Sequence, residues 1–145
     1  MVLISHRGNT EGPHKDENNP QHIDNTLKLG FDVEIDIWYL REKIYLGHNK
    51  PQYLIDLKWI EDRVSRVWVH CKNIDSLMYL KNCGVNIRYF WHQNDDVTLT
   101  SNGLFWTYPG KKLTKNSIAC MPELKQFKNI EISYGICSDY ITKYK

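Results

Sequence analysis

Four short polar clusters lie inside or directly after segments whose composition is typical of β-strands. They are Ser5-His6-Arg7-Gly8, Glu34-Ile35-Asp36, Gly47-His48-Asn49 and His70-Cys71-Lys72. Buried strands rarely end in such groups, because each group costs free energy unless it is paired or hydrated. Histidines, carboxylates, an arginine and a lysine are together the groups that phosphoryl chemistry around a metal ion requires. We therefore expect the four clusters to meet at one site.

Glu34 and Asp36 are the candidate metal ligands. They lie two residues apart on a predicted strand, so their side chains face the same side. The residues between and around them (Val33, Ile35 and Ile37) make the other face apolar and predict a half-buried strand. Carboxylate oxygens at this spacing suit Mg²⁺ or Ca²⁺ better than a soft metal. An exposed acidic strand face is the alternative that the residues leave open.

The two histidines that follow predicted strands, His6 and His48, are candidates for proton transfer. Cleavage of a phosphodiester needs one proton taken from the nucleophile and one given to the leaving oxygen, and histidine does both near neutral pH. Arg7 has a planar guanidinium that can bind phosphate through two hydrogen bonds. Lys72 shares a strand face with His70. Each could instead be structural: a hydrogen-bonded histidine or a surface lysine.

The chain alternates predicted strands and helices. Short strands are predicted over residues 2–5, 31–40, 43–46, 66–69, 87–91, 97–100, 104–107, 117–120 and 134–137. Helices are predicted over 21–29, about 55–64 and 75–83, with a weak one near 123–127. The aromatic pairs Trp91-His92 and Phe105-Trp106 fit a pocket wall and core packing equally well.

This alternation predicts a parallel sheet with crossover connections in an α/β protein. A number of strands near eight favours a barrel, but a complete (β/α)8 barrel normally needs about 200 residues or more. We therefore predict a reduced (β/α)8 TIM-like barrel with several helices missing, formed as a single domain by residues 1–145. A doubly wound sheet is the alternative, and it is disfavoured because no glycine-rich phosphate loop follows the first strand.

The order of the motifs resembles that of the glycerophosphodiester phosphodiesterase family. The family's His-Arg-Gly, Pro-Glu-Asn-Thr, Glu-x-Asp and His-Asp motifs are similar to segments of this chain that begin at His6, Glu17, Glu34 and His48. Its Glu-x-Lys strand is similar to His70-Cys71-Lys72, and its late Trp-Thr and closing Thr-Asp are similar to Trp106-Thr107 and Ser138-Asp139. The matches are in order and span most of the chain.

The resemblance implies a barrel that holds a divalent cation, usually Mg²⁺ or Ca²⁺, on Glu34 and Asp36. It implies that His6 and His48 are the acid–base pair and that Arg7 and Lys72 bind the phosphate. The chain departs from the pattern in three motifs, one of which is Pro-Glu-Asn-Thr. The strand-four glutamate of the family, a metal ligand, is replaced by His70, which can also ligate, and the aspartate after the second histidine is replaced by Asn49.

The overall composition restricts which classes of partner and which cellular location we expect. The formal net charge is +2, from 19 basic and 17 acidic residues, which is too balanced to argue for a nucleic-acid partner. No run approaches the roughly 18 apolar residues of a membrane span, and no signal peptide is visible. The four cysteines show no CxxC spacing, so a reducing cytoplasm is expected. Missing helices would expose apolar barrel wall, which favours a homodimer.

We therefore expect a metal-dependent phosphodiesterase that acts on a glycerophosphodiester or a related small phosphodiester. The alternative is a catalytically degenerate barrel that binds a phosphorylated sugar or a lipid headgroup without turning it over. The replacement of the third acidic ligand by His70 favours that alternative.

Overall fold

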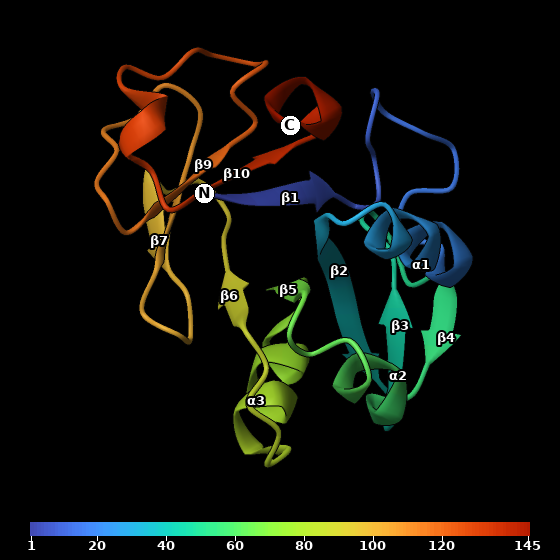
Figure 1. Cartoon of the computed structure of the whole chain (residues 1–145). Coiled ribbons are helices and arrows are strands. Elements are labelled where there is room, and N and C mark those ends of the chain that lie inside the picture. Colours follow the sequence, from blue (N-terminus) through green and yellow to red (C-terminus); the bar gives the residue numbers. More distant parts are fainter.

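The computed structural model describes residues 1–145, and its ten strands form one curled mixed sheet (Figure 1). The strands are β1 (Val2–His6), β2 (Asp32–Leu40), β3 (Lys43–Leu46), β4 (Tyr53–Ile55), β5 (Val67–Cys71), β6 (Tyr89–Trp91), β7 (Val97–Leu99), β8 (Phe105–Thr107), β9 (Ser117–Cys120) and β10 (Gly135–Ser138). The helices are α1 (Pro20–Lys28), α2 (Leu57–Glu61) and α3 (Ile74–Asn82), with 3₁₀ turns η1 (Ile130–Ile132) and η2 (Ile141–Tyr144).

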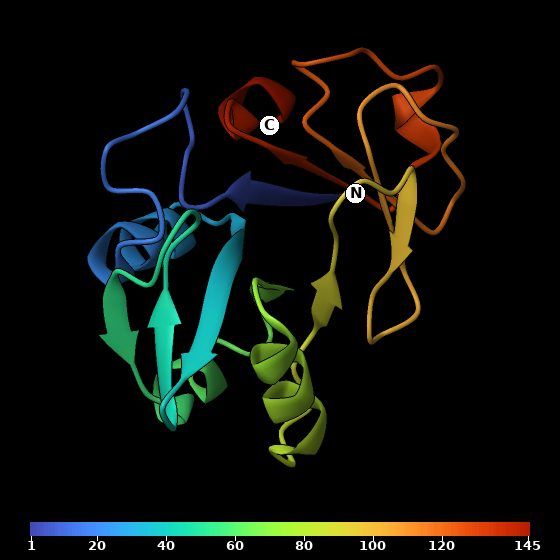
Figure 2. The ribbon, with the colours of Figure 1, turned by 180° about the vertical axis from the view of Figure 1, so that it is seen from behind.

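Parallel strands form the body of the sheet in the spatial order β6-β5-β2-β1-β10-β9-β8. Strand β2 is central because both of its edges are paired. One edge pairs with β5, and the other pairs with β1 along residues 32–34 and with β3 along residues 37–40. Strands β3 and β4 add an antiparallel extension, and β7 runs antiparallel beside β8. The views in Figures 1 and 2 show the sheet curling around its inner face, with α2 and α3 outside it.

The predicted (β/α)8 TIM-like barrel is wrong: the fold is a half-barrel, a curled mixed sheet with three short helices. The cause lies in the connections. Helices α1 and α3 are the crossovers from β1 to β2 and from β5 to β6. Residues 108–116 and 121–134, which join β8, β9 and β10, contain no α-helix, and the weak helix predicted near 123–127 does not form. A crossover needs about a dozen residues or more, so the first of these segments is too short for a helix.

Local sequence signals account for the helices that do form. Asn19 accepts a hydrogen bond from the Gln21 backbone N–H at the start of α1, and Pro20 occupies the first turn, where its missing N–H costs nothing. At α3, Asn73 and Ser76 form a reciprocal capping box. These ends agree with the predicted helices to within a few residues, whereas α2 is shorter than predicted and β4 was not predicted.

Three apolar clusters pack the sheet, and the smallest, beside β9 and β10, contains Phe31, Leu113, Ala119, Ile136 and Ile141. The outer cluster packs β2, β3 and β5 against the helices and includes Val33, Ile35 and Ile37, all fully buried. The inner cluster contains Ile4, Trp68, Phe90, Trp106, Ile118, Cys120 and Cys137. Glu34 and Asp36 alternate with the outer residues, so they project to the inner face. No helix of this chain combines the length and the apolar character needed to cross a membrane.

Candidate functional site

Strand register assembles the site at the carboxyl ends of β1, β2 and β5. His6 is the partner of Glu34 across the β1–β2 pair, and Asp36 is the partner of His70 across the β2–β5 pair. Because all three strands are parallel, their polar ends lie at one edge of the sheet. Pairing therefore brings together residues that are 28 to 64 positions apart in the sequence (from His6 to Glu34 and from His6 to His70).

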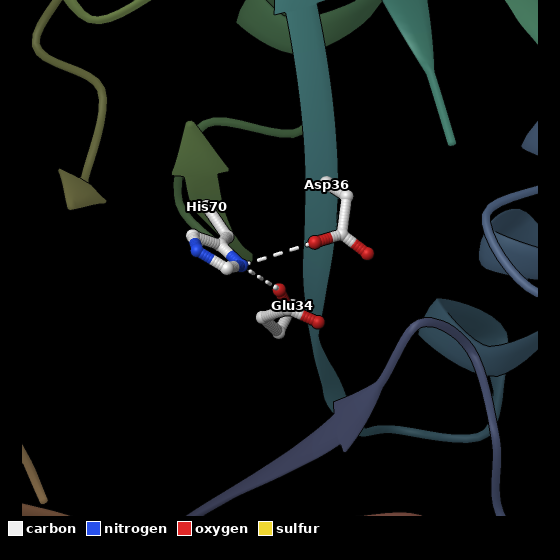
Figure 3. A group of neighbouring side chains, drawn as sticks. All are labelled: Glu34, Asp36 and His70. Carbon is white, nitrogen blue, oxygen red and sulfur yellow. Dashed lines mark ion pairs between the residues drawn. The ribbon is translucent and has the colours of Figure 1, made fainter. Parts of the chain in front are cut away.

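The three predicted metal ligands form one cluster. Potential ligand atoms of Glu34, Asp36 and His70 all lie within 4.8 Å of one another. His70 Nδ1 lies 3.0 Å from Asp36 Oδ1 and 3.8 Å from Glu34 Oε1 (Figure 3). The two carboxylates are 2% and 0% exposed, so they do not form an exposed acidic strand face. A cluster of two carboxylates and one imidazole has the donor types that a divalent cation accepts.

Asp36 is held by positive and hydrogen-bonding groups. Its Oδ2 accepts a hydrogen bond from Asn18 Nδ2 at 2.9 Å and lies 3.0 Å from Arg7 Nε. Its Oδ1 lies 3.6 Å from Lys72 Nζ. Burial would raise the pKa of Asp36, but the contact with His70 and the charge of Arg7 hold that pKa below its ordinary value. Asp36 is therefore ionised and fixes the two predicted phosphate-binding side chains.

Glu34 has a different environment, although it lies only two residues away. Its Oε2 is buried without a hydrogen-bond partner, and His6 Nε2 lies 3.9 Å from that atom. Burial and the charge of Asp36 raise the pKa of Glu34 well above its ordinary value. A buried carboxylate without a partner costs free energy, and a cation between Glu34 and Asp36 would remove that cost. The residues therefore fit a bound divalent ion.

The second nitrogen of His70 supports the same interpretation. Nε2 lies 3.4 Å from the backbone carbonyl of His92, which accepts its proton in one tautomer. Without an ion, the Nδ1–H of His70 faces Asp36 Oδ1 at 3.0 Å. In the tautomer with its proton on Nε2, Nδ1 would offer a lone pair to a cation held by the two carboxylates. The ring is also held by stacking on Phe90, with centroids 5.0 Å apart and planes 4° from parallel.

His6 is oriented by an aspartate at the end of β10. The contact between His6 Nδ1 and Asp139 Oδ1 is 2.7 Å long, and Asn9 Nδ2 donates to the same oxygen at 2.8 Å. Burial would raise the pKa of Asp139, but the hydrogen bond with His6 lowers it below its ordinary value. With Nδ1 engaged, the free Nε2 lies on the side of Glu34, at 3.9 Å. His6 is thus positioned to exchange a proton beside the metal-ligand cluster.

Arg7 occupies a strained turn directly after β1. Its φ is +56°, a conformation that non-glycine residues seldom adopt and that is found at functional sites. The backbone N–H of Arg7 donates to the Glu34 carbonyl at 3.0 Å, which ties the turn to β2. Its Nη1 donates to Glu17 Oε2 at 3.2 Å. Two carboxylates, from Glu17 and Asp36, therefore fix the guanidinium with donors to spare for an anion.

His48 depends on the glycine before it. Gly47 has a φ of +146°, and a Cβ atom there would lie 2.1 Å from the carbonyl oxygen of Lys50. The Gly47 N–H donates to the Asp36 carbonyl at 3.1 Å, which places His48 beside the site. Burial and the nearby charge of Arg7 lower the pKa of His48, so its imidazole is neutral near pH 7.

A cavity of about 680 Å³ joins these groups. Six of the seven predicted site residues line it: His6, Arg7, Glu34, His48, His70 and Lys72. Asp36 is not part of the lining and lies behind them, in contact with Arg7, His70 and Lys72. The cavity volume is within the range of small-molecule sites, about 300–1,000 Å³.

Several residues that hold the site together were not predicted from the sequence. Asn18 both donates to Asp36 Oδ2 and accepts from the Asp36 backbone N–H at 2.9 Å, and Asp139 orients His6. Both lie in segments that the motif comparison had marked, so their positions were available but their contacts were not. His92 stacks on Tyr108 with centroids 3.4 Å apart, and no motif pointed to that pair.

Comparisons of the chain with protein-family models, with curated proteins and with solved structures find no match. The resemblance to glycerophosphodiester phosphodiesterases therefore remains a prediction from the motifs.

Proposed function

We propose that this protein hydrolyses small phosphodiesters with the help of a divalent cation, Mg²⁺ or Ca²⁺. The observation that carries the proposal is the buried Glu34 carboxylate, which has no hydrogen-bond partner and lies between two histidines in a cavity that also contains Arg7 and Lys72. Such a carboxylate destabilises the protein by itself, and binding of a cation is the function that explains it. A small phosphodiester of the glycerophosphodiester type is the predicted substrate.

Glu34, Asp36 and His70 would hold the cation. When bound, the cation neutralises negative charge that develops on the phosphate oxygens. Arg7 and Lys72 add two fixed positive charges on the same side of the cavity, and Asp36 keeps both in place by direct contact. The phosphate would therefore bind over Asp36, with its oxygens shared by these groups.

The two histidines would perform the proton transfers. His48, which is neutral near pH 7 because its pKa is lowered, is suited to accept the proton of the attacking water. The new P–O bond forms as the P–O bond to the leaving alcohol breaks. His6, with Nδ1 fixed on Asp139, would give a proton from Nε2 to the departing oxygen.

Single substitutions test the proposal. His6→Ala should lower hydrolysis of bis(p-nitrophenyl) phosphate and glycerophosphocholine by roughly 10²–10⁴-fold, the usual contribution of a general acid or base. Glu34→Ala should abolish that hydrolysis, because the variant lacks a proposed cation ligand. A chelator should abolish the activity, and Mg²⁺ or Ca²⁺ should restore it. His14→Ala is the matched control, because His14 is half-exposed and lies outside the cavity lining. Full activity of both site variants would disprove the proposal.

A second candidate is binding of a phosphorylated sugar or lipid headgroup without turnover. It is favoured by the imidazole of His70 in place of a third carboxylate and by the contacts that already occupy Asp36. Calorimetry that shows binding of glycerophosphocholine, with no cleavage in Mg²⁺, Mn²⁺, Ca²⁺ or Zn²⁺, would select it. A cytoplasmic location and a homodimer remain predictions from the sequence.

A further inference from the structure

The cavity has a second wall, and its chemistry differs from that of the first. The charged groups come from β1, β2 and β5 and from the loop after β3. The second wall comes from the segments after β8 and β9 and presents Tyr108, Pro109, Met121 and Leu124. A wall of this kind offers an aromatic ring and aliphatic carbon to a ligand whose phosphate lies among the charges.

Stacked rings form the floor between the two walls. Phe90 stacks on His70 at 5.0 Å and on Trp106 at 4.4 Å between centroids. Both Phe90 and Trp106 also line the cavity. A continuous aromatic surface therefore leads from a candidate metal ligand toward the second wall, so a group attached to a bound phosphate would meet apolar surface at once.

Two features of the second wall indicate that it is built for a ligand. Met121 has a φ of +50° directly after β9, a strained conformation for a methionine, and it lines the cavity. Leu124 is 70% exposed at the same cavity, although leucine gains free energy when it is buried. The Leu124 N–H donates to the Met121 carbonyl at 3.0 Å, so one turn presents both side chains.

The size of the cavity agrees with a ligand larger than phosphate. A phosphate group has five heavy atoms and fills roughly 150 Å³ at about 30 Å³ for each water-sized atom. The cavity of about 680 Å³ therefore leaves most of its space to other parts of the ligand.

We propose that the second wall binds an apolar ester group, so that the substrate is a phosphodiester that carries an aryl or alkyl group on one side. This inference rests on the proposed function for the phosphate end. It narrows the substrate class, because a glycerol ester presents hydroxyl groups to Met121 and Leu124, and these side chains make no hydrogen bonds with hydroxyls.

Phosphinates test the wall independently of catalysis, because both of their substituents are bonded through carbon and cannot be hydrolysed. Binding of dimethylphosphinate, methylphenylphosphinate and methyloctylphosphinate would be measured by calorimetry in Ca²⁺. We expect the phenyl or the octyl compound to bind at least tenfold more tightly than the dimethyl compound. A phenyl preference would identify an aryl group and an octyl preference an alkyl chain, and either supports the proposal.

The variant Met121→Asn/Leu124→Asn should remove this preference while dimethylphosphinate binding stays the same. Asparagine tolerates the positive φ of residue 121, so the turn should keep its shape. Leu99→Asn is the matched control, because Leu99 is 65% exposed on β7 and does not line the cavity.

Equal binding of the three phosphinates, no binding of any, or a preference that survives in the double variant would overturn the inference. A preference that the double variant removes, in a protein that cleaves no phosphodiester, would support the apolar wall and reject the proposed hydrolysis.

Discussion

The two walls of the cavity are built by different means. The charged wall stands on paired strands, where the register of β1, β2 and β5 fixes which side chains meet. The apolar wall stands on the irregular segments after β8 and β9, where single turns such as that of Met121 and Leu124 determine the surface. The chemistry of this site is therefore tied to the sheet, whereas its ligand preference can change without altering the sheet.

The largest effect is expected from Asp36→Asn, on the strand-held wall. The substitution removes the buried negative charge that contacts both Arg7 and Lys72, which should lower the free energy of unfolding by about 3–5 kcal/mol. Urea denaturation measures this change. Asp96→Asn is the matched control, because it breaks an exposed ion pair with Lys111 and should cost about 1 kcal/mol or less. Equal losses in both variants would mean that Asp36 does not anchor this wall.

Glu34→Gln should change the free energy of unfolding in the opposite direction, although Glu34 lies on the same strand. Replacing the unpartnered buried carboxylate by a neutral amide should stabilise the protein by about 1 kcal/mol at pH 8 without divalent cations. The variant should also lose the rise in melting temperature that Ca²⁺ gives the wild-type protein. The control Glu131→Gln changes an exposed carboxylate, so it should neither stabilise the protein without cations nor remove the rise in melting temperature with Ca²⁺. Destabilisation by Glu34→Gln in the absence of cations would show that the buried Glu34 carboxylate does not cost the protein free energy.

A smaller effect should appear as pH dependence at the β1–β10 junction. Because the folded pKa of Asp139 lies below its ordinary value of 3.8, this carboxylate stabilises the protein above that pH. The stabilisation should fade as the pH falls below 3.8 through the folded pKa. Urea denaturation should therefore show that the wild type has a higher free energy of unfolding than Asp139→Asn at pH 6, and that this difference shrinks as the pH is lowered to 3. An advantage independent of pH would show that the His6–Asp139 contact is not an ionic one.

The smallest effect on stability is expected on the loop-held wall. Leu124→Ala should change the free energy of unfolding by less than about 0.5 kcal/mol, because the side chain is 70% exposed. Leu80→Ala removes the same atoms from a site that is 1% exposed and should cost about 2–5 kcal/mol. Thermal or urea unfolding of the two variants makes the comparison. A large loss in Leu124→Ala would place that residue in the core and not at a ligand surface.

The sequence predicted local features well and their assembly poorly. Alternation within Val33–Ile37 was enough to place Glu34 and Asp36 on one face, and the predicted helices over 21–29 and 75–83 agree with α1 and α3 to within a few residues. The number of strands did not reveal that β4 and β7 pair antiparallel with their neighbours. The pairing of β1 with β10 and of β2 with β5 depends on partners far along the chain, and no local pattern records it.

The same limit explains what was missed at the site. The pairing of His6 with Asp139 joins the two ends of the sequence through the β1–β10 pair, and the hydrogen bond of Asn18 to Asp36 depends on how the first loop folds back over β2. Motif order identified these segments. Only the folded chain identifies the atoms that meet.

The central position of β2 also has a consequence for motion. A strand paired on both edges and packed on the outer core opens rarely, so the amides of residues 33–37 should be among the slowest to exchange with solvent. The segments after β8 and β9 contain no paired strand, and the second is held to β10 through Glu123, which accepts hydrogen bonds from Ser138 Oγ at 3.0 Å and from the Asp139 N–H at 2.8 Å. Ligands would enter and leave past the exposed side chain of Leu124 while the carboxylates of β2 stay in place. Ligand exchange would therefore not require the strand pairs of the sheet to open.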